Sequence, residues 1–295
     1  MKGAIAYRIE PEMDRQEVLC TTYQMRNFYR QLGDGFFTNL DVMNYVQHLK
    51  AVQMMKPGWR VLDVCCGRGL LLPLIRWYRK DIGEYVGVDI SEKNVREAQT
   101  RTAYKQIDHE TYYEFPHRWV ICNVAEMGQH LPASYFDFAV YTSSIEHMHK
   151  EAGEQSLHQC AKVLKPGAKL FLSCPNTPED QDGYDTQYKA HVYEWKLSEL
   201  RTALKDARFE VEVEYGLVIG KRDLQKAIEA QGPQVKLLLQ PILDYLPTEF
   251  LTAALAPAFP VQSKEVLVVA GRRDKTRHKA QGTGSEVSGL WSAVR

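Results

Sequence analysis

Short apolar runs alternate with amphipathic stretches over residues 60–215 of this chain. The apolar runs have the length of buried strands, and apolar side chains recur at helical spacing in the stretches between them. The expected strands are 60–64, 85–89, 118–122, 136–141, 169–174, 209–215 and, last, 266–270. The expected helices are 70–79, 91–106, 153–163 and 196–205. Strands that alternate with helices predict βαβ units, and right-handed crossovers then give a doubly wound, Rossmann-like α/β sheet.

Three segments lie outside this alternation. Residues 1–55 predict an N-terminal helical cap of two helices, separated by a turn at Gly33 and Gly35. Residues 217–262 predict a helical insertion before the last strand, broken by five prolines, that serves as a lid or a dimer contact. Residues 272–295 are polar and rich in Gly and Ser, which predicts a flexible tail. The α/β domain is expected to span residues 56–271.

Composition and charge narrow the class of protein. Lys+Arg and Asp+Glu both number 37, so the net charge is zero, whereas a dedicated nucleic-acid binder would be basic. No apolar run approaches the ~20 residues of a membrane span, and the N-terminus lacks the apolar core of a signal peptide. The six cysteines show no C-x-x-C spacing and predict buried free thiols. We therefore expect a cytoplasmic protein with no membrane partner.

A glycine turn follows the first expected strand, in the segment VLDVCCGRGL at 61–70. Gly67 and Gly69 would let the backbone approach a ligand, and the N-terminus of the next helix offers free N–H groups. Asp89 ends the second strand, 20 residues after Gly69, where an acid can accept hydrogen bonds from ribose hydroxyls. Together these features predict an adenosine-binding site.

The turn also indicates which adenosine cofactor binds. A dinucleotide fingerprint needs a third glycine, but Leu72 stands there, and the chain lacks the glycine-lysine motif of a P-loop. Asp63 precedes the turn, and a carboxylate there would repel a pyrophosphate. A cofactor with a cationic amine and a sulfonium suits Asp63 better.

The segment resembles the first motif of class I S-adenosylmethionine-dependent methyltransferases, an acid-x-G-x-G-x-G pattern in which Cys65 replaces the first glycine. Further segments follow in family order at 86–91, 121–126, 136–148 and 163–170, so the resemblance covers about residues 55–215. It implies that the turn surrounds the methionine part, that Asp89 binds ribose and that adenine lies between the second and third motifs. The implied cofactor residues are Asp63, Cys65, Gly67, Gly69, Asp89, Ile90, Asn123, Val124 and Tyr141.

Two regions could act on the methyl acceptor. Glu146, after the fourth strand, could be a base, could hold an acceptor amine, or could be a plain helix-start carboxylate. The polar loop 177–195 after the fifth strand carries His191 as a second candidate, although a structural hydrogen bond would also explain it. Glu194, Tyr184 and Tyr188 are candidates for the acceptor pocket. His191 and Glu194 could bind a metal, but the sequence presents no third ligand, so we assign none.

Three functions remain open at this stage. A methyltransferase that acts on a small organic molecule, in specialised metabolism for example, fits the zero net charge and the insertion. A methyltransferase that acts on RNA, DNA or protein is the alternative, although Tyr-Thr-Ser-Ser-Ile replaces the Pro-Pro-aromatic motif of amino-methylating DNA enzymes at 141–145. A non-catalytic subunit that binds S-adenosylmethionine is the third. We do not expect a nucleic-acid partner, and a homodimer is compatible with the insertion.

Overall fold

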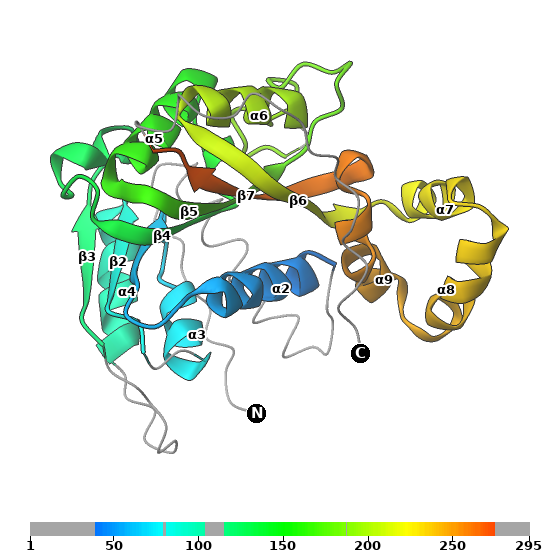
Figure 1. Ribbon diagram of the computed structural model, residues 1–295, viewed down its shortest axis with the longest axis horizontal. Coiled ribbons are helices and arrows are strands. Elements are labelled where there is room, and N and C mark those ends of the chain that lie inside the picture. The colour runs from blue at the N-terminus through cyan, green and yellow to red at the C-terminus, as the bar shows by residue number, and fades with distance from the viewer. Residues whose placement is uncertain (1–38, 79–80, 104–114, 187, 275–295) are drawn as a thin grey trace, which may run out of the picture.

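The computed structural model describes residues 39–78, 81–103, 115–186 and 188–274. Within these residues, seven strands form one sheet in the order β3-β2-β1-β4-β5-β7-β6 (Figure 1). The first five strands pair in parallel, and β7 lies antiparallel between β5 and β6. The strands are β1 (Arg60–Val64), β2 (Glu84–Asp89), β3 (His117–Ile121), β4 (Phe136–Thr142), β5 (Leu164–Pro175), β6 (Phe209–Ile219) and β7 (Ser263–Arg272). The predicted doubly wound α/β sheet is confirmed.

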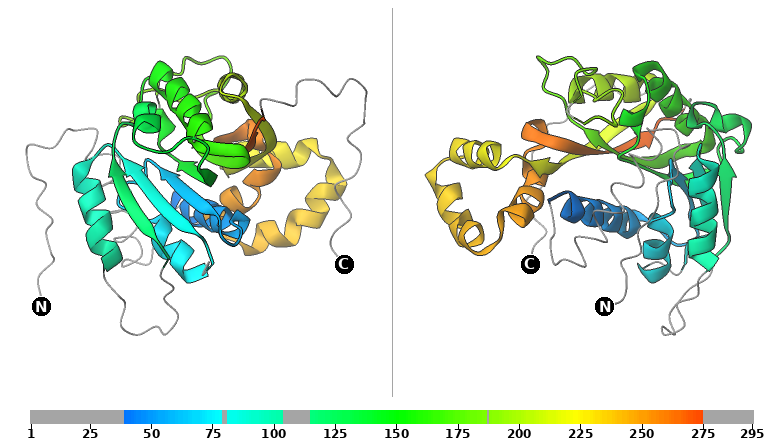
Figure 2. Two further views of the ribbon diagram at one scale, coloured as in Figure 1. Left: turned by 60° about the vertical axis from the view of Figure 1, so that its left-hand side comes forward. Right: turned by 180° about the vertical axis from the view of Figure 1, so that it is seen from behind.

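Helices cover both faces of the sheet (Figures 1 and 2). One apolar core joins one face of the strands to α5 (Lys150–Val163) and α6 (Leu197–Asp206). A second core joins the other face to α2 (Asn39–Met54) and α3 (Leu71–Tyr78). The helix α4 (Glu92–Ala103) follows β2 and contacts β2 and β3. Because both faces are covered, the central strands are apolar on both sides, and they appear in the sequence as continuous apolar runs.

The N-terminal cap is described only in part. Its second expected helix is α2, which buries Met43, Ala51 and Val52 against the sheet. The first expected helix and the expected flexible tail lie outside the described residues. No described helix has the length and apolar character needed to cross a membrane.

The segment before the last strand differs from the prediction at its start. Residues 217–219 continue β6, because their side chains are buried and their backbones pair with β7 through register shifts. The helical part therefore begins at Lys221. It comprises α7 (Lys221–Ala230), α8 (Pro233–Tyr245), α9 (Thr248–Ala254) and two short 3-10 turns, Ala256–Ala258 and Pro260–Gln262.

The helices α7 and α8 stand off one edge of the sheet, while α9 contacts α2 (Figures 1 and 2). The insertion has a small core of its own, which includes Leu224, Ile228 and Leu251. The helix α8 buries none of its residues, and Leu237 and Leu238 are each 76% exposed. The role of the whole insertion as a lid or a dimer contact stays a prediction.

The described cysteines are free thiols, as expected. Cys66, Cys122, Cys160 and Cys174 are buried, and Cys65 is partly buried. Burial raises the pKa of the Cys160 thiol to about 12. Cys20 lies outside the described residues.

Candidate functional site

The glycine turn leaves β1 at the point where the strand order reverses, between β1 and β4. Ligands of open α/β sheets bind at this switch point, outside the carboxyl ends of the strands. Cys65, Gly67 and Gly69 have φ values of 54°, 52° and 71°. This left-handed backbone explains why the family pattern has glycine at all three positions. At Gly69 a Cβ would also lie 2.5 Å from the Trp119 ring, so the turn could not accept a larger residue without moving that ring.

Asp89 ties the tip of β2 to the glycine turn. The Gly67 N–H donates to its Oδ2 at 2.8 Å, and the Ser91 N–H donates to its Oδ1 at 2.9 Å. Each carboxylate oxygen has a second lone pair, which leaves capacity for a ribose hydroxyl. The next residue, Ile90, is 68% exposed at the same strand end. The geometry thus combines an anchored acceptor with an apolar surface, as a nucleoside site requires.

Asp63 lies deeper than the sequence suggests. Its carboxylate is buried and accepts a hydrogen bond from the Tyr85 hydroxyl at 2.6 Å. Burial raises its pKa from 3.8 to about 7, which the Tyr85 hydrogen bond opposes. Tyr85 stands two strand residues before Gly87, the pairing partner of Asp63, but nothing in the sequence alone marks it as that partner.

The raised pKa of Asp63 predicts a specific dependence of stability on pH. Between about pH 4 and pH 7 the folded protein keeps the proton on Asp63 while the unfolded chain releases it, so this group lowers stability as pH rises. The variant Asp63→Asn removes that loss. The free energy of unfolding of Asp63→Asn minus that of wild type should therefore be about 2–3 kcal/mol larger at pH 8 than at pH 5, which means that the variant gains stability relative to wild type as pH rises.

Urea unfolding of both proteins at pH 5 and pH 8 measures this difference. Any constant penalty from the buried amide cancels between the two pH values. An equal difference between the proteins at both pH values would show that Asp63 titrates normally. The exposed Asp206→Asn variant is the control and should show no such change.

The remaining predicted cofactor residues lie along the same edge. Asn123 caps a 3-10 turn (Val124–Gln129) by accepting the Ala125 N–H on its Oδ1 at 2.9 Å, and this oxygen keeps a second lone pair for a further donor. Val124, the next residue, is buried. The Tyr141 side chain is buried, and its hydroxyl lies 3.1 Å from Ser156 Oγ. Only the backbone of Tyr141 is therefore available to a ligand, and the roles of these residues stay predictions.

Glu146 is the centre of a second cluster, which follows β4. It lies in a 3-10 turn (Ile145–His147), is 2% exposed, and its Oε2 has no hydrogen-bond partner. Its backbone carbonyl accepts the N–H groups of Val192 and Tyr193 at 2.8 and 3.1 Å. These bonds hold the loop after β5 against the turn after β4, which brings two regions singled out in the sequence together.

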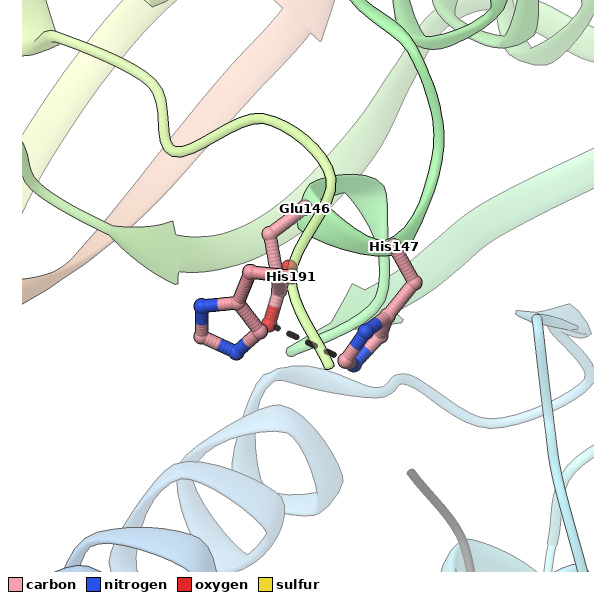
Figure 3. Close-up of side chains that lie close together, drawn as sticks. All are labelled: Glu146, His147 and His191. Carbon is pink, nitrogen blue, oxygen red and sulfur yellow. Dashed lines mark ion pairs between the residues drawn. The ribbon is translucent and has the colours of Figure 1, made fainter. Parts of the chain in front are cut away.

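Two histidines flank the Glu146 carboxylate (Figure 3). His147 Nε2 lies 4.0 Å from Glu146 Oε1, and the rings of His147 and His191 meet edge to face with centroids 5.1 Å apart. One potential ligand atom from each of Glu146, His147 and His191 lies within 4.8 Å of the other two. The structure therefore brings together three potential metal ligands, whereas the sequence alone suggested only two.

A hydrogen bond at Nδ1 fixes the orientation of each imidazole ring. His191 Nδ1 lies 2.6 Å from Glu194 Oε1, and His147 Nδ1 lies 3.0 Å from the carbonyl oxygen of Ala190. Because a carboxylate and a carbonyl can only accept, Nδ1 is the protonated nitrogen in each ring. The predicted residues His191 and Glu194 thus form a pair, and both are buried or nearly so.

Burial dominates the electrostatics of this cluster. It raises the pKa of Glu146 to about 7, an effect that His191 opposes, and it lowers the pKa of His147. Glu265, at the start of β7, has its pKa raised by burial and then by the charges of Glu146 and Glu194. No motif marks Glu265 in the sequence.

The two aromatic candidates are exposed residues of the loop after β5. Tyr184 packs edge to face on Tyr193 with centroids 4.8 Å apart, and Tyr188 lies 5.3 Å from the ring of His191. Tyr184 is 50% exposed and Tyr188 is 43% exposed, and of the two only Tyr188 has a ring contact with a residue of the cluster, His191.

Sequence reasoning missed His48. This residue of α2 lies 3.4 Å from Thr142 Oγ1, at the end of β4, and burial lowers its pKa to about 4. Its neighbour Gln47 accepts a hydrogen bond from Ser173 at 2.7 Å. The N-terminal helix therefore closes one side of the edge where both clusters lie, and no sequence motif links it to that edge.

The fold and the glycine turn match a known family. The family described as Methyltransferase domain matches residues 23–214, well over half of the chain. The chain belongs to this family, which confirms the resemblance and implies S-adenosylmethionine as the methyl donor. A solved structure described as a SAM-dependent methyltransferase from Archaeoglobus fulgidus shares the fold, with a TM-score of 0.52 and 16% identity over 85% of this chain and 99% of that chain.

Curated relatives match shorter parts of the chain. A probable S-adenosylmethionine-dependent methyltransferase of Mycolicibacterium smegmatis is 30% identical over 55% of this chain and 56% of its own length. The human mitochondrial ubiquinone biosynthesis O-methyltransferase is 32% identical over 40% of this chain and 29% of its length. An mRNA cap guanine-N(7) methyltransferase of Oryza sativa is 29% identical over 45% of this chain and 37% of its own length. The chain thus spans about half, or less, of the length of these relatives.

Proposed function

We propose that this protein transfers a methyl group from S-adenosylmethionine to a small organic acceptor. One observation carries the proposal. The glycine turn with Asp89 and the cluster around Glu146 follow the carboxyl ends of β1, β2 and β4 in one parallel sheet, and therefore share one edge. A cofactor site and a proton-handling site on the same edge are what a bound donor and acceptor require.

The donor set of the turn fits S-adenosylmethionine. Asp89 would accept the ribose hydroxyls, exposed Ile90 would cover adenine, and the left-handed turn at Gly67 and Gly69 leaves room for the methionine part. When bound, this cofactor supplies a methyl group on a sulfonium, which is already a strong leaving group. The protein then has to align the acceptor and exclude water.

The acceptor end is proposed to be the cluster of Glu146, His147 and His191. Its buried carboxylate and two fixed imidazoles can take up or position the proton of an acceptor hydroxyl or amine. The exposed Tyr184 and Tyr188 would contact the acceptor, and the helix α2 encloses the edge from the other side.

The size of the acceptor is the finer part of the proposal. The zero net charge and the two-sided enclosure by α2 and the loop after β5 favour a small molecule. The human relative is named for ubiquinone biosynthesis, which agrees with this choice. The rice relative is named for the mRNA cap and supports RNA as the alternative acceptor.

Calorimetry with S-adenosylmethionine tests the donor, with NAD as the comparison. We expect binding of S-adenosylmethionine alone. Binding of NAD alone, or of neither, would overturn the proposal. A screen of phenols, quinols, amines and capped RNA, read by the release of S-adenosylhomocysteine, then tests the acceptor. Turnover confined to capped RNA would favour the alternative.

A further inference from the structure

We propose that Glu146, His147 and His191 bind a divalent transition-metal ion. These residues come from the turn after β4 and the loop after β5, which the fold holds together through the Glu146 backbone. Their potential ligand atoms all lie within 4.8 Å of one another, close enough to share one ion after small side-chain adjustments (Figure 3). Two imidazoles and one carboxylate form a ligand set that zinc and non-haem iron sites use.

The hydrogen bonds of the two rings favour metal binding. In each ring Nδ1 donates to an acceptor, Glu194 for His191 and the carbonyl of Ala190 for His147. The proton on Nδ1 leaves Nε2 with its lone pair, which is the form that a metal needs. Carboxylate and carbonyl acceptors behind ligating histidines are the usual outer partners of metal sites, and they fix both the tautomer and the ring orientation.

Glu146 provides an independent observation. Its side chain is 2% exposed, and its Oε2 has no hydrogen-bond partner. A buried carboxylate oxygen without a partner is costly, and a native protein seldom retains one without a reason. The carboxylate lies between the two imidazoles (Figure 3). A cation bound there would satisfy this oxygen.

The ligand types select the kind of ion. Two nitrogen ligands favour Zn²⁺, Co²⁺, Fe²⁺ or Mn²⁺ over Mg²⁺ and Ca²⁺, which prefer oxygen ligands. Three protein ligands leave at least one position open, as in catalytic sites. Glu194 is a positioning residue in this arrangement, because it acts on the ion through His191.

The ion would also narrow the acceptor class, and this step rests on the proposed function. An acceptor hydroxyl in the open position would lose its proton to solvent more easily, because the cation stabilises the oxyanion. The oxygen lone pair would then form the O–C bond while the C–S bond breaks, and the sulfonium would leave as a neutral thioether. The site therefore favours oxygen acceptors over amines.

Titration of the full chain with Co²⁺ tests the site without cofactor or acceptor, because protein-bound Co²⁺ absorbs visible light. We expect one ion per chain, with Zn²⁺ as a competitor and Mg²⁺ without effect. Glu146→Gln and His147→Gln should each weaken binding by at least about 100-fold. Glu194→Gln should weaken it by about 10- to 100-fold while leaving all three ligands in place.

The exposed histidine of α5 provides the matched control, since His158→Gln should bind Co²⁺ as wild type does. Circular dichroism verifies that each variant is folded, and wild-type titration tests the site even if a variant is not. No Co²⁺ binding by wild type, or equal binding by Glu146→Gln, would overturn the inference. Metal binding without S-adenosylmethionine binding would instead overturn only the proposed function.

Discussion

Replacement of Asp89 by alanine is expected to lower the affinity for S-adenosylmethionine by about 10- to 100-fold. The variant loses a buried carboxylate that would bind ribose, and hydrogen bonds to charged groups contribute about 1.5–3 kcal/mol each. It also loses the bonds from the N–H groups of Gly67 and Ser91, which hold the glycine turn against β2. Calorimetry of the folded variant measures the loss.

Two further variants separate ribose binding from support of the turn. Asp89→Asn keeps one oxygen acceptor and should lose less affinity than Asp89→Ala. Asp206→Ala removes an exposed carboxylate at the end of α6 and should bind as wild type does. Unchanged affinity in Asp89→Ala would exclude Asp89 from the cofactor site.

The central strands were predictable because they are buried on both faces, whereas the edge strand β3 buries none of its residues. The chain has to supply a continuous apolar run for such a central strand, as in Tyr85 and Val86 of β2 or Leu170 and Phe171 of β5, and that signal is local. Strand ends were less predictable. Residues 217–219 pair with β7 only through a register shift, which depends on a partner about 45 positions away.

The cofactor edge was predictable for a similar reason. The turn and Asp89 are fixed to the ends of β1 and β2, so their spacing along the chain reports their distance in space. The buried partner of Asp63 was not predictable, because Tyr85 approaches it across the sheet.

The cluster around Glu146 contains residues whose proximity cannot be inferred from their spacing in the sequence. Glu146 and His191 were singled out separately, but their contact depends on two backbone bonds to the Glu146 carbonyl. His147 stood beside Glu146 in the sequence and became informative only once His191 lay opposite its ring. The set of three potential ligands could be recognised only once the fold of the loop after β5 had brought His191 close to Glu146 and His147.

Glu146→Gln is expected to lower kcat by about 100- to 10,000-fold with the acceptor identified by the screen, while S-adenosylmethionine affinity stays the same. The change keeps the size of the side chain but removes the charge that takes up the acceptor's proton or holds the cation. Steady-state kinetics and calorimetry on the same preparation measure the two quantities. Unchanged kcat would show that Glu146 takes no part in the transfer of the acceptor's proton.

The exposed Glu151→Gln variant of α5 controls for loss of charge in general and should keep the wild-type kcat. Added metal separates the two roles of Glu146. If the carboxylate acts as a ligand, high Zn²⁺ or Co²⁺ should restore part of the activity of Glu146→Gln, because the two histidines still bind the ion weakly. If it acts as the base, metal should restore nothing, and a chelator should leave the wild-type rate unchanged. The same variant therefore tests the reaction and identifies how its proton is handled.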